Sequence, residues 1–287
     1  MLHIMNTCGQ IENLFDHGVF AYDKWEKYMN AICPEAAAML QETVKKYLNT
    51  GNYTFDKDFL PVLNAVYRNP ELELLQKSFS TVTDDLNSKI IERFGKELSA
   101  DLILYLGLGC SAGKVMEIDY SPVILLGIEK ILELRWHTRN AMYGLVYHEL
   151  GHAYHAQHGK LEQTTDDNRL SWVWQLFTEG IAMYFEQTLV GDPDFFHQDT
   201  NGWKSWCDEH FEQILHDFHQ DLTTMTRFTQ RYFGDWCDYH GHGDTGYYMG
   251  SQFIHFLRKN HSFDDLINLE ISQVYPLYLE FVQYTFA

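Results

Sequence analysis

The chain has 287 residues, of which 45% are hydrophobic and 15% aromatic, so it can bury a sizeable core. A composition this rich in aromatic residues excludes a disordered chain. The acidic residues number 40 against 21 Lys and Arg, and the formal net charge of -19 argues against nucleic acid or an anionic membrane surface as partners.

The five cysteines are widely spaced and include no CxxC pair, which predicts free thiols rather than a disulfide framework or a thiolate zinc site. The N-terminal segment lacks the basic and continuous apolar regions of a signal peptide, and no apolar run approaches the length of a membrane span. We therefore expect a cytoplasmic protein that does not cross a membrane.

Residues 1–97 have the apolar spacing of helices, which predicts a helical N-terminal region. Within it, the segment Phe20–Asn49 is expected to form two helices, because Pro34 cannot continue an existing helix without losing a hydrogen bond. Two further helices are expected over Lys57–Arg68 and Glu71–Phe94.

Two short apolar runs follow, and their bounding Gly, Ser and Pro residues indicate strands over Asp101–Gly107 and Pro122–Ile128. The segment GLGCSAGK between them is rich in glycine but lacks the GxxxxGK[ST] spacing of a phosphate-binding loop. It is therefore interpreted as a turn between two strands of a small sheet.

The rest of the chain returns to helical spacing, apart from an aromatic and His-rich segment of irregular periodicity at residues 195–243. Helices are expected over Arg139–His158, Leu170–Val190, 245–259 and 263–284. These elements predict an α+β fold that is mainly helical, with residues 98–287 forming a domain after the N-terminal region.

The most informative motif is an HExxH formed by His148, Glu149 and His152. Residues four apart lie on one face of a helix, so both imidazoles can reach one ion, whereas Glu149 is offset by about 100° and can reach a water on that ion. A shuffled chain of this composition would contain the motif about once in twenty times, so the context matters. The surrounding residues are largely apolar, and burying these groups without a metal would be costly.

Glu179 is the candidate for the third ligand, since catalytic zinc takes three protein ligands and leaves one position for water. It is an isolated carboxylate in an otherwise apolar helix, for which a buried ion pair is the alternative explanation. Gly180, together with Gly144 and Gly151 in the HExxH helix, indicates close helix packing, because a glycine costs about 1 kcal/mol of helix stability relative to alanine.

The sequence HELGH followed by TEGIA resembles the gluzincin branch of the zincin-like metallopeptidases, and within it a poorly characterised family of predicted zinc-dependent proteases. The later Gly246-Tyr247-Tyr248-Met249-Gly250 is similar to a helix start in that family. The resemblance covers about residues 100–260. It implies a zincin-like catalytic domain with a small mixed sheet, an active-site helix and a glutamate helix, with Zn2+ as the cofactor and a peptide or protein as the substrate.

Two features depart from this pattern. Thermolysin-like members place an aspartate four residues after the ligand glutamate to orient the first histidine, and this chain has Met183 there. Metal-bound histidines nearly always have such a partner, for which Glu186 and Asp119 are the candidates. The interval before the ligand glutamate is also longer, and we place the additional loop at residues 158–169.

The resemblance and the chemistry together imply hydrolysis of peptide bonds by a metal-activated water, with Glu149 as the general base and then the general acid. A hydrogen-bond donor for the developing oxyanion is also needed. Tyr247 or Tyr248 is expected in that role, with His240 and His242 behind them. In the zincin fold the substrate lies against an edge strand, which Val123–Gly127 would provide.

Other interpretations stay open. A catalytically inactive zincin-fold protein that binds a metal or a partner would show the same constellation, although Glu149 favours catalysis. The segment Gly113–Glu117 is only loosely similar to the GxMEN element of aminopeptidases, so endopeptidase and aminopeptidase activity are not distinguished. The tract His240–Asp244 is interpreted as a solvated glycine-rich loop rather than a metal site. No role is assigned to His137, His155 and His158, and the oligomeric state is unknown.

Overall fold

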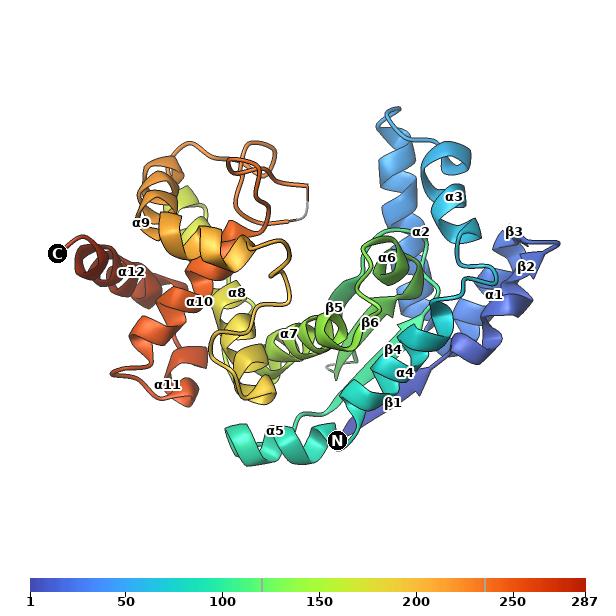
Figure 1. Cartoon of the computed structure of the whole chain (residues 1–287), viewed down its shortest axis with the longest axis horizontal. Coiled ribbons are helices and arrows are strands. Elements are labelled where there is room, and N and C mark those ends of the chain that lie inside the picture. The colour runs from blue at the N-terminus through green and yellow to red at the C-terminus, as the bar shows by residue number, and fades with distance from the viewer. Residues whose placement is uncertain (120, 235) are drawn as a thin grey trace. The chain divides into compact units, whose positions relative to one another are not determined.

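The computed structural model describes residues 1–119, 121–234 and 236–287. These residues form two compact units, shown together in Figure 1. The first unit comprises Met1–Lys89 and Glu97–Val146, and the second comprises Ile90–Lys96 and Tyr147–Ala287. The predicted boundary after residue 97 differs from this division, because the sheet belongs to the same unit as the N-terminal helices. Within the described ranges, no helix is both long enough and apolar enough to cross a membrane.

A mixed sheet of four strands lies in the described part of the first unit, in the order β1-β4-β6-β5. The strands β1, β4, β6 and β5 span Leu2–Asn6, Ala100–Tyr105, Ser121–Gly127 and Gly113–Ile118. The first three are parallel, and β5 is antiparallel to β6. Strands β4 and β6 are buried over most of their length, which explains their continuous apolar sequences. Both predicted strands are therefore confirmed.

The structure corrects two expectations about this sheet. The chain begins with a strand rather than a helix, since β1 pairs with β4 from Leu2 opposite Ala100 onwards. This strand is too short and too mixed in polarity to give an alternating signal. Strand β6 is not at the edge, as was expected of Val123–Gly127, because β5 pairs along its outer side.

The segment GLGCSAGK forms a loop that leads into β5 at Gly113. The backbone amides of Gly107 and Gly109 each donate a hydrogen bond of 2.8 Å to the buried carboxylate of Glu129. A carboxylate of the protein thus uses the donors that a phosphate would need, which supports the interpretation of this segment as a turn.

The helices of the first unit follow the predictions in part. Helices α1 (Tyr22–Ile32) and α2 (Pro34–Asn49) meet at Pro34 as expected, and this proline is the first residue of α2, where its missing N–H costs little. The single helix predicted over Glu71–Phe94 is divided, because Asp85 adopts a left-handed conformation with φ of 53°. The remaining elements of this unit are η1 (Cys8–Leu14), β2 (Phe15–Asp16), β3 (Val19–Phe20), η2 (Phe55–Phe59), α3 (Leu60–Asn64), α4 (Leu72–Thr83) and α6 (Ile128–Glu133). Helix α5 (Leu86–Phe94) begins in this unit and ends in the second.

The second unit is helical in its described part. Helix α7 (Arg139–His158) continues into it from the first unit and matches its predicted bounds. It is followed by α8 (Asn168–Val190), α9 (Trp203–Asp221), α10 (Thr245–Leu257), α11 (Phe263–Ile267) and α12 (Ile271–Thr285). Helix α9 was not predicted, and the single helix expected at 263–284 is divided into α11 and α12. The expectation of a mainly helical α+β protein is confirmed.

Helix α8 is the central element of this unit, with α10 and α12 packed against it (Figure 1). The side chain of Asp167 accepts hydrogen bonds from the first amides of α8, and Gly191, with φ of 83°, ends the helix. A Cβ on Gly180 would overlap the carbonyl of Gly250, and one on Gly250 would lie 2.7 Å from the oxygen of Leu176. The close approach predicted at Gly180 is therefore real, and its partner is α10.

Candidate metal centre

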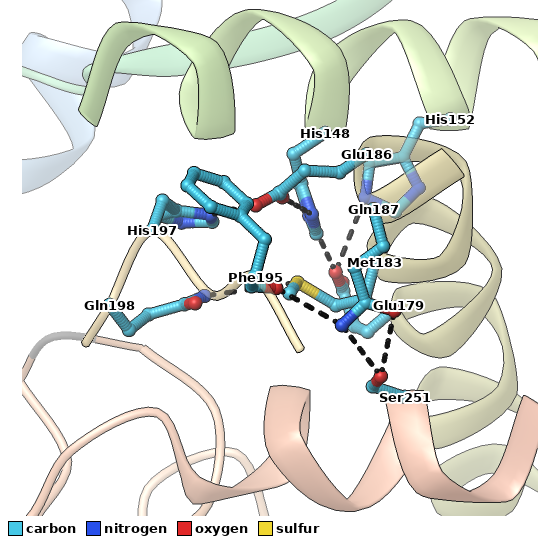
Figure 2. Close-up of polar contacts among 10 residues, drawn as sticks. All are labelled: His148, His152, Glu179, Met183, Glu186, Gln187, Phe195, His197, Gln198 and Ser251. Carbon is cyan, nitrogen blue, oxygen red and sulfur yellow. Dashed lines mark hydrogen bonds and ion pairs between the residues drawn. The ribbon is translucent and has the colours of Figure 1, made fainter. Parts of the chain in front are cut away.

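Three side chains that commonly bind metals converge in the second unit (Figure 2). His148 and His152 come from successive turns of α7, and Glu179 comes from α8. Both histidine Nε2 atoms lie 3.2 Å from Oε2 of Glu179, and all three ligand atoms lie within 4.8 Å of one another. The structure thus brings together the residues that the sequence indicates as metal ligands.

The close approach of α7 and α8 depends on a glycine within the HExxH motif. A Cβ on Gly151 would lie 2.8 Å from the Cα of Ala182 and 3.1 Å from the Cβ of Phe185. Any side chain at this position would push the two helices apart, because one of these atoms belongs to the backbone. Gly151 therefore lets the carboxylate on α8 reach the two imidazoles on α7.

The donor atoms fit a zinc ion in chemistry and spacing. Imidazole nitrogen and carboxylate oxygen are common zinc donors, and two of them at about 2.0–2.1 Å from a tetrahedral ion are separated by about 3.3 Å. The nitrogen-to-oxygen separations of 3.2 Å here are close to that value.

The cluster is partly accessible to solvent. The side chain of His148 is 8% exposed, whereas those of His152 and Glu179 are 18% and 17% exposed. A structural zinc site is closed by four protein ligands, while a catalytic site keeps one position for water. Three candidate ligands match the number of protein ligands in a catalytic site.

The charges of this cluster favour a cation. Burial alone would lower the pKa of His148, but the carboxylates of Glu179 and Glu186 raise it to about 10. Burial would raise the pKa of Glu179, yet the imidazoles of His152 and His148 hold it well below its usual range. The two shifts are coupled, because the carboxylates favour the protonated form of His148 and the imidazoles favour the ionised form of Glu179. A divalent cation at the same place would compensate the buried negative charge.

Glu149 is half-buried on α7, beside the first histidine of the motif. Burial raises the pKa of this carboxyl group, and the nearby imidazoles of His152 and His148 oppose the shift. A carboxylate with a raised pKa is a better proton acceptor at neutral pH than an ordinary glutamate. Its environment suits the base that the HExxH motif predicts.

The second nitrogen of His148 faces another carboxylate. Its Nδ1 lies 3.6 Å from Oε2 of Glu186 and has no hydrogen-bond partner among the described residues. The same carboxylate accepts from Nδ1 of His197, which is 3.0 and 3.1 Å from its two oxygens. Of the two predicted partners for this histidine, Glu186 is therefore in place, whereas Asp119 belongs to the first unit.

The two tyrosines of the GYYMG segment occupy different environments. The ring of Tyr247 lies 5.5 Å from the ring of His148, measured between centroids. The hydroxyl of Tyr248 donates a 2.5 Å hydrogen bond to Asp208 on α9, and the ring is buried against Phe196. Burial and Asp208 raise the pKa of Tyr248. Of the two tyrosines expected as oxyanion donors, Tyr248 already has a carboxylate partner for its hydroxyl.

His240 and His242, which precede this segment in the sequence, lie in a turn. Tyr239 and His242 exchange backbone hydrogen bonds of 2.9 and 3.1 Å around His240 and Gly241, and the ring of His242 stacks on Trp206. This geometry agrees with a glycine-rich loop.

Three further histidines had no predicted role. His137 lies 3.4 Å from Glu71 in the first unit, and His158 packs on the ring of Tyr154 in the second. His155 is fully buried, and neither of its ring nitrogens has a hydrogen-bond partner in the described part of the chain. Burial lowers its pKa to about 3, so it stays neutral.

Sequence reasoning missed His197, which lies in the irregular segment after α8. A signal was present, because Glu186 is a second carboxylate on the apolar α8 and lies two turns beyond Glu179 on nearly the same helix face. A buried carboxylate needs a donor, and His197 is the first histidine after the helix.

Comparisons of the chain with protein-family models, with curated proteins and with solved structures found no match.

Proposed function

We propose that the chain is a zinc-dependent peptidase of the gluzincin type, with the metal held by His148, His152 and Glu179. The observation that carries this proposal is the convergence of two imidazoles on one carboxylate oxygen, each at 3.2 Å, in a cluster that is partly accessible to solvent. When bound at these donors, a zinc ion supplies a Lewis acid that polarises a carbonyl group and makes a water molecule more acidic.

Glu149 is the proposed proton carrier. It takes a proton from the attacking water and delivers it to the amine that leaves the cleaved peptide bond. Its raised pKa supports both steps, because a carboxylate that is too acidic would not retain the proton long enough to transfer it.

Tyr247 is the proposed donor to the oxyanion that develops on the scissile carbonyl. Its ring lies beside that of His148, whereas the hydroxyl of its neighbour Tyr248 is bound to Asp208. A hydrogen-bond donor in this role typically lowers the barrier by about 3 kcal/mol.

The proposed substrate is a peptide or a protein, and the proposed location is the cytoplasm. All five cysteines are free thiols, which supports a reducing compartment. Cleavage of peptides with blocked and free N-termini would distinguish endopeptidase from aminopeptidase activity, because an aminopeptidase must bind a free α-amine.

The test combines zinc content with cleavage of a quenched peptide library by the wild type and Glu149→Gln. Because a side-chain amide does not accept a proton from water, we expect the variant to retain zinc but to lose cleavage by about 100-fold or more. Glu162→Gln, which removes an exposed carboxylate of the same unit, is the control and should retain full activity.

Two results would contradict the proposal. If both proteins retained zinc and neither cleaved any peptide, a metal- or partner-binding role without turnover would replace it. Equal cleavage by the wild type and Glu149→Gln would remove Glu149 from the mechanism.

A further inference from the structure

His148 needs a partner for its second nitrogen, and the residue expected to provide one is absent. Met183 lies one turn beyond Glu179 on α8 and is fully buried. Its thioether is at best a weak acceptor, so it cannot replace the missing carboxylate. The buried Nδ1 of His148 would then have to find an acceptor from another position.

Glu186 supplies a carboxylate from the next turn of the same helix. It is fully buried, and its Oε2 lies 3.6 Å from Nδ1 of His148. Figure 2 shows this carboxylate between the rings of His148 and His197. An imidazole that offers the Nε2 lone pair to a metal carries its proton on Nδ1, which must face an acceptor. Glu186 is placed to be that acceptor.

His197 holds Glu186 from the opposite side. Its Nδ1 lies 3.0 and 3.1 Å from the two carboxylate oxygens, and its side chain is only 8% exposed. A carboxylate that accepts from a buried donor loses rotational freedom, so the direction of its remaining lone pairs is fixed.

The segment that carries His197 is anchored through the two residues before it, Phe195 and Phe196. The backbone oxygen of Phe195 accepts a 3.1 Å hydrogen bond from the side-chain amide of Gln187 on α8. That amide also lies 3.0 Å from the hydroxyl of Ser251 on α10. The ring of Phe196 packs against Trp203 and Tyr248. His197 is therefore presented by a fixed segment rather than by a free loop.

We propose that Glu186 and His197 act together as positioning residues that replace the missing aspartate, orient His148 toward the metal and thereby set the affinity for zinc. This inference rests on the proposed metal site. It extends that site by two residues, one of them from a segment where the sequence indicates no function.

The test is the dissociation constant for zinc, measured by competition with a chelator on the full chain. We expect Glu186→Gln and His197→Phe to weaken zinc binding about 10- to 100-fold, the usual effect of removing a hydrogen-bond partner of a metal-bound histidine. His197→Asn keeps an N–H donor near the position of Nδ1 and should recover most of the affinity.

The control is Asp208→Asn, which alters a carboxylate bound to a buried Tyr248 in the same unit but outside the site. It should bind zinc as the wild type does, even if its melting temperature falls. Circular dichroism of each variant separates a loss of zinc affinity from a loss of folding. The substitution Glu186→Gln is nearly isosteric, so it should not disturb the packing.

The outcomes separate this inference from the proposed function. Unchanged zinc affinity in Glu186→Gln and His197→Phe would overturn the inference while leaving the metal site intact. An equal loss of zinc affinity in His197→Asn and Asp208→Asn would assign the effect to general destabilisation. That result would also overturn the inference. A wild type with no zinc affinity, or with an affinity unaffected by His152→Ala, would overturn the proposed metal site and this inference with it.

Discussion

At the scale of single residues, three carboxylates and three imidazoles share the site, and their roles differ because their surroundings differ. Glu179 has two imidazole nitrogens at 3.2 Å and a pKa well below its usual range, which suits a ligand. Burial dominates at Glu149 and raises its pKa, which suits a base. Glu186 accepts from His197 and faces the far side of His148, which suits an orienting group. We therefore propose three different roles for one residue type.

The two adjacent tyrosines allow a matched comparison. Tyr247→Phe should lower kcat about 100-fold with little change in KM, because it removes a donor needed only as the oxyanion develops. Tyr248→Phe should leave kcat unchanged and lower the free energy of unfolding by about 1 kcal/mol, because the hydrogen bond from Tyr248 to Asp208 is lost while Asp208 keeps its ion pair with Lys204. Steady-state kinetics and urea unfolding of both variants check the prediction. The reverse pattern would assign the oxyanion role to Tyr248.

His155 makes stability depend on pH. Its pKa in the folded chain is about 3, against about 6.5 when it is unfolded. Between these values the unfolded chain binds a proton that the folded chain does not, so stability is complete above pH 6.5 and falls as the pH decreases. By pH 5 the loss from this residue alone should be about 2 kcal/mol.

Replacement of His155 by leucine should remove this part of the acid sensitivity. The ring lies near the aromatic rings of Trp174 and Phe177, and the backbone of Ile267 has the smallest influence on its pKa. Urea unfolding of the wild type and His155→Leu at pH 7 and pH 5 measures the difference. Equal losses of stability in both proteins over this range would contradict the assignment.

At the scale of the elements, helix packing depends on glycines where backbones meet. Gly180→Ala should destabilise the chain by about 2 kcal/mol, since overpacking against the rigid carbonyl of Gly250 outweighs the gain of about 1 kcal/mol in helix propensity. Thermal unfolding measures the change. Gly9→Ala is the control, because a Cβ there meets no atom within 4 Å. A stabilised Gly180→Ala variant would show that α8 and α10 can separate at no cost.

The long helices around the site could be predicted because local signals define them. Gly159 and Gly191 follow the last residues of α7 and α8, and the HExxH spacing has meaning only on a helix. Local signals fail for β1, because its stability comes from pairing with β4, about 100 residues away in the sequence. They fail for α9 as well, whose aromatic and His-rich sequence hides the apolar face that includes Ile214, Leu215 and Phe218.

The candidate site was predicted to the extent that it is encoded locally. The spacing of His148, Glu149 and His152 predicts two candidate ligands and a candidate base, and the isolation of Glu179 in an apolar helix predicts the third candidate ligand. The contact of His197 with Glu186 depends on how the segment after α8 folds back toward that helix. The spacing of apolar residues in the sequence does not reveal this path. The different environments of Tyr247 and Tyr248 likewise depend on α9, an element that was not predicted.

At the scale of the whole molecule, zinc should stabilise the folded chain. An ion that binds only the folded state at 100 times its dissociation constant adds about 2.7 kcal/mol to the free energy of unfolding. Thermal unfolding with zinc and with a chelator should therefore give a higher melting temperature in zinc for the wild type. Glu179→Ala should show no such shift. A shift of equal size in this variant would place the stabilising ion elsewhere.

The central claim is that two imidazoles and one carboxylate hold a single metal ion, and zinc X-ray absorption spectroscopy of the purified full chain tests it most directly. We predict one zinc per chain, with scattering from two imidazoles and from oxygen ligands at about 2.0–2.1 Å, and loss of that zinc in Glu179→Ala. Sulfur ligands at about 2.3 Å, or zinc that is retained unchanged in Glu179→Ala, would contradict the claim.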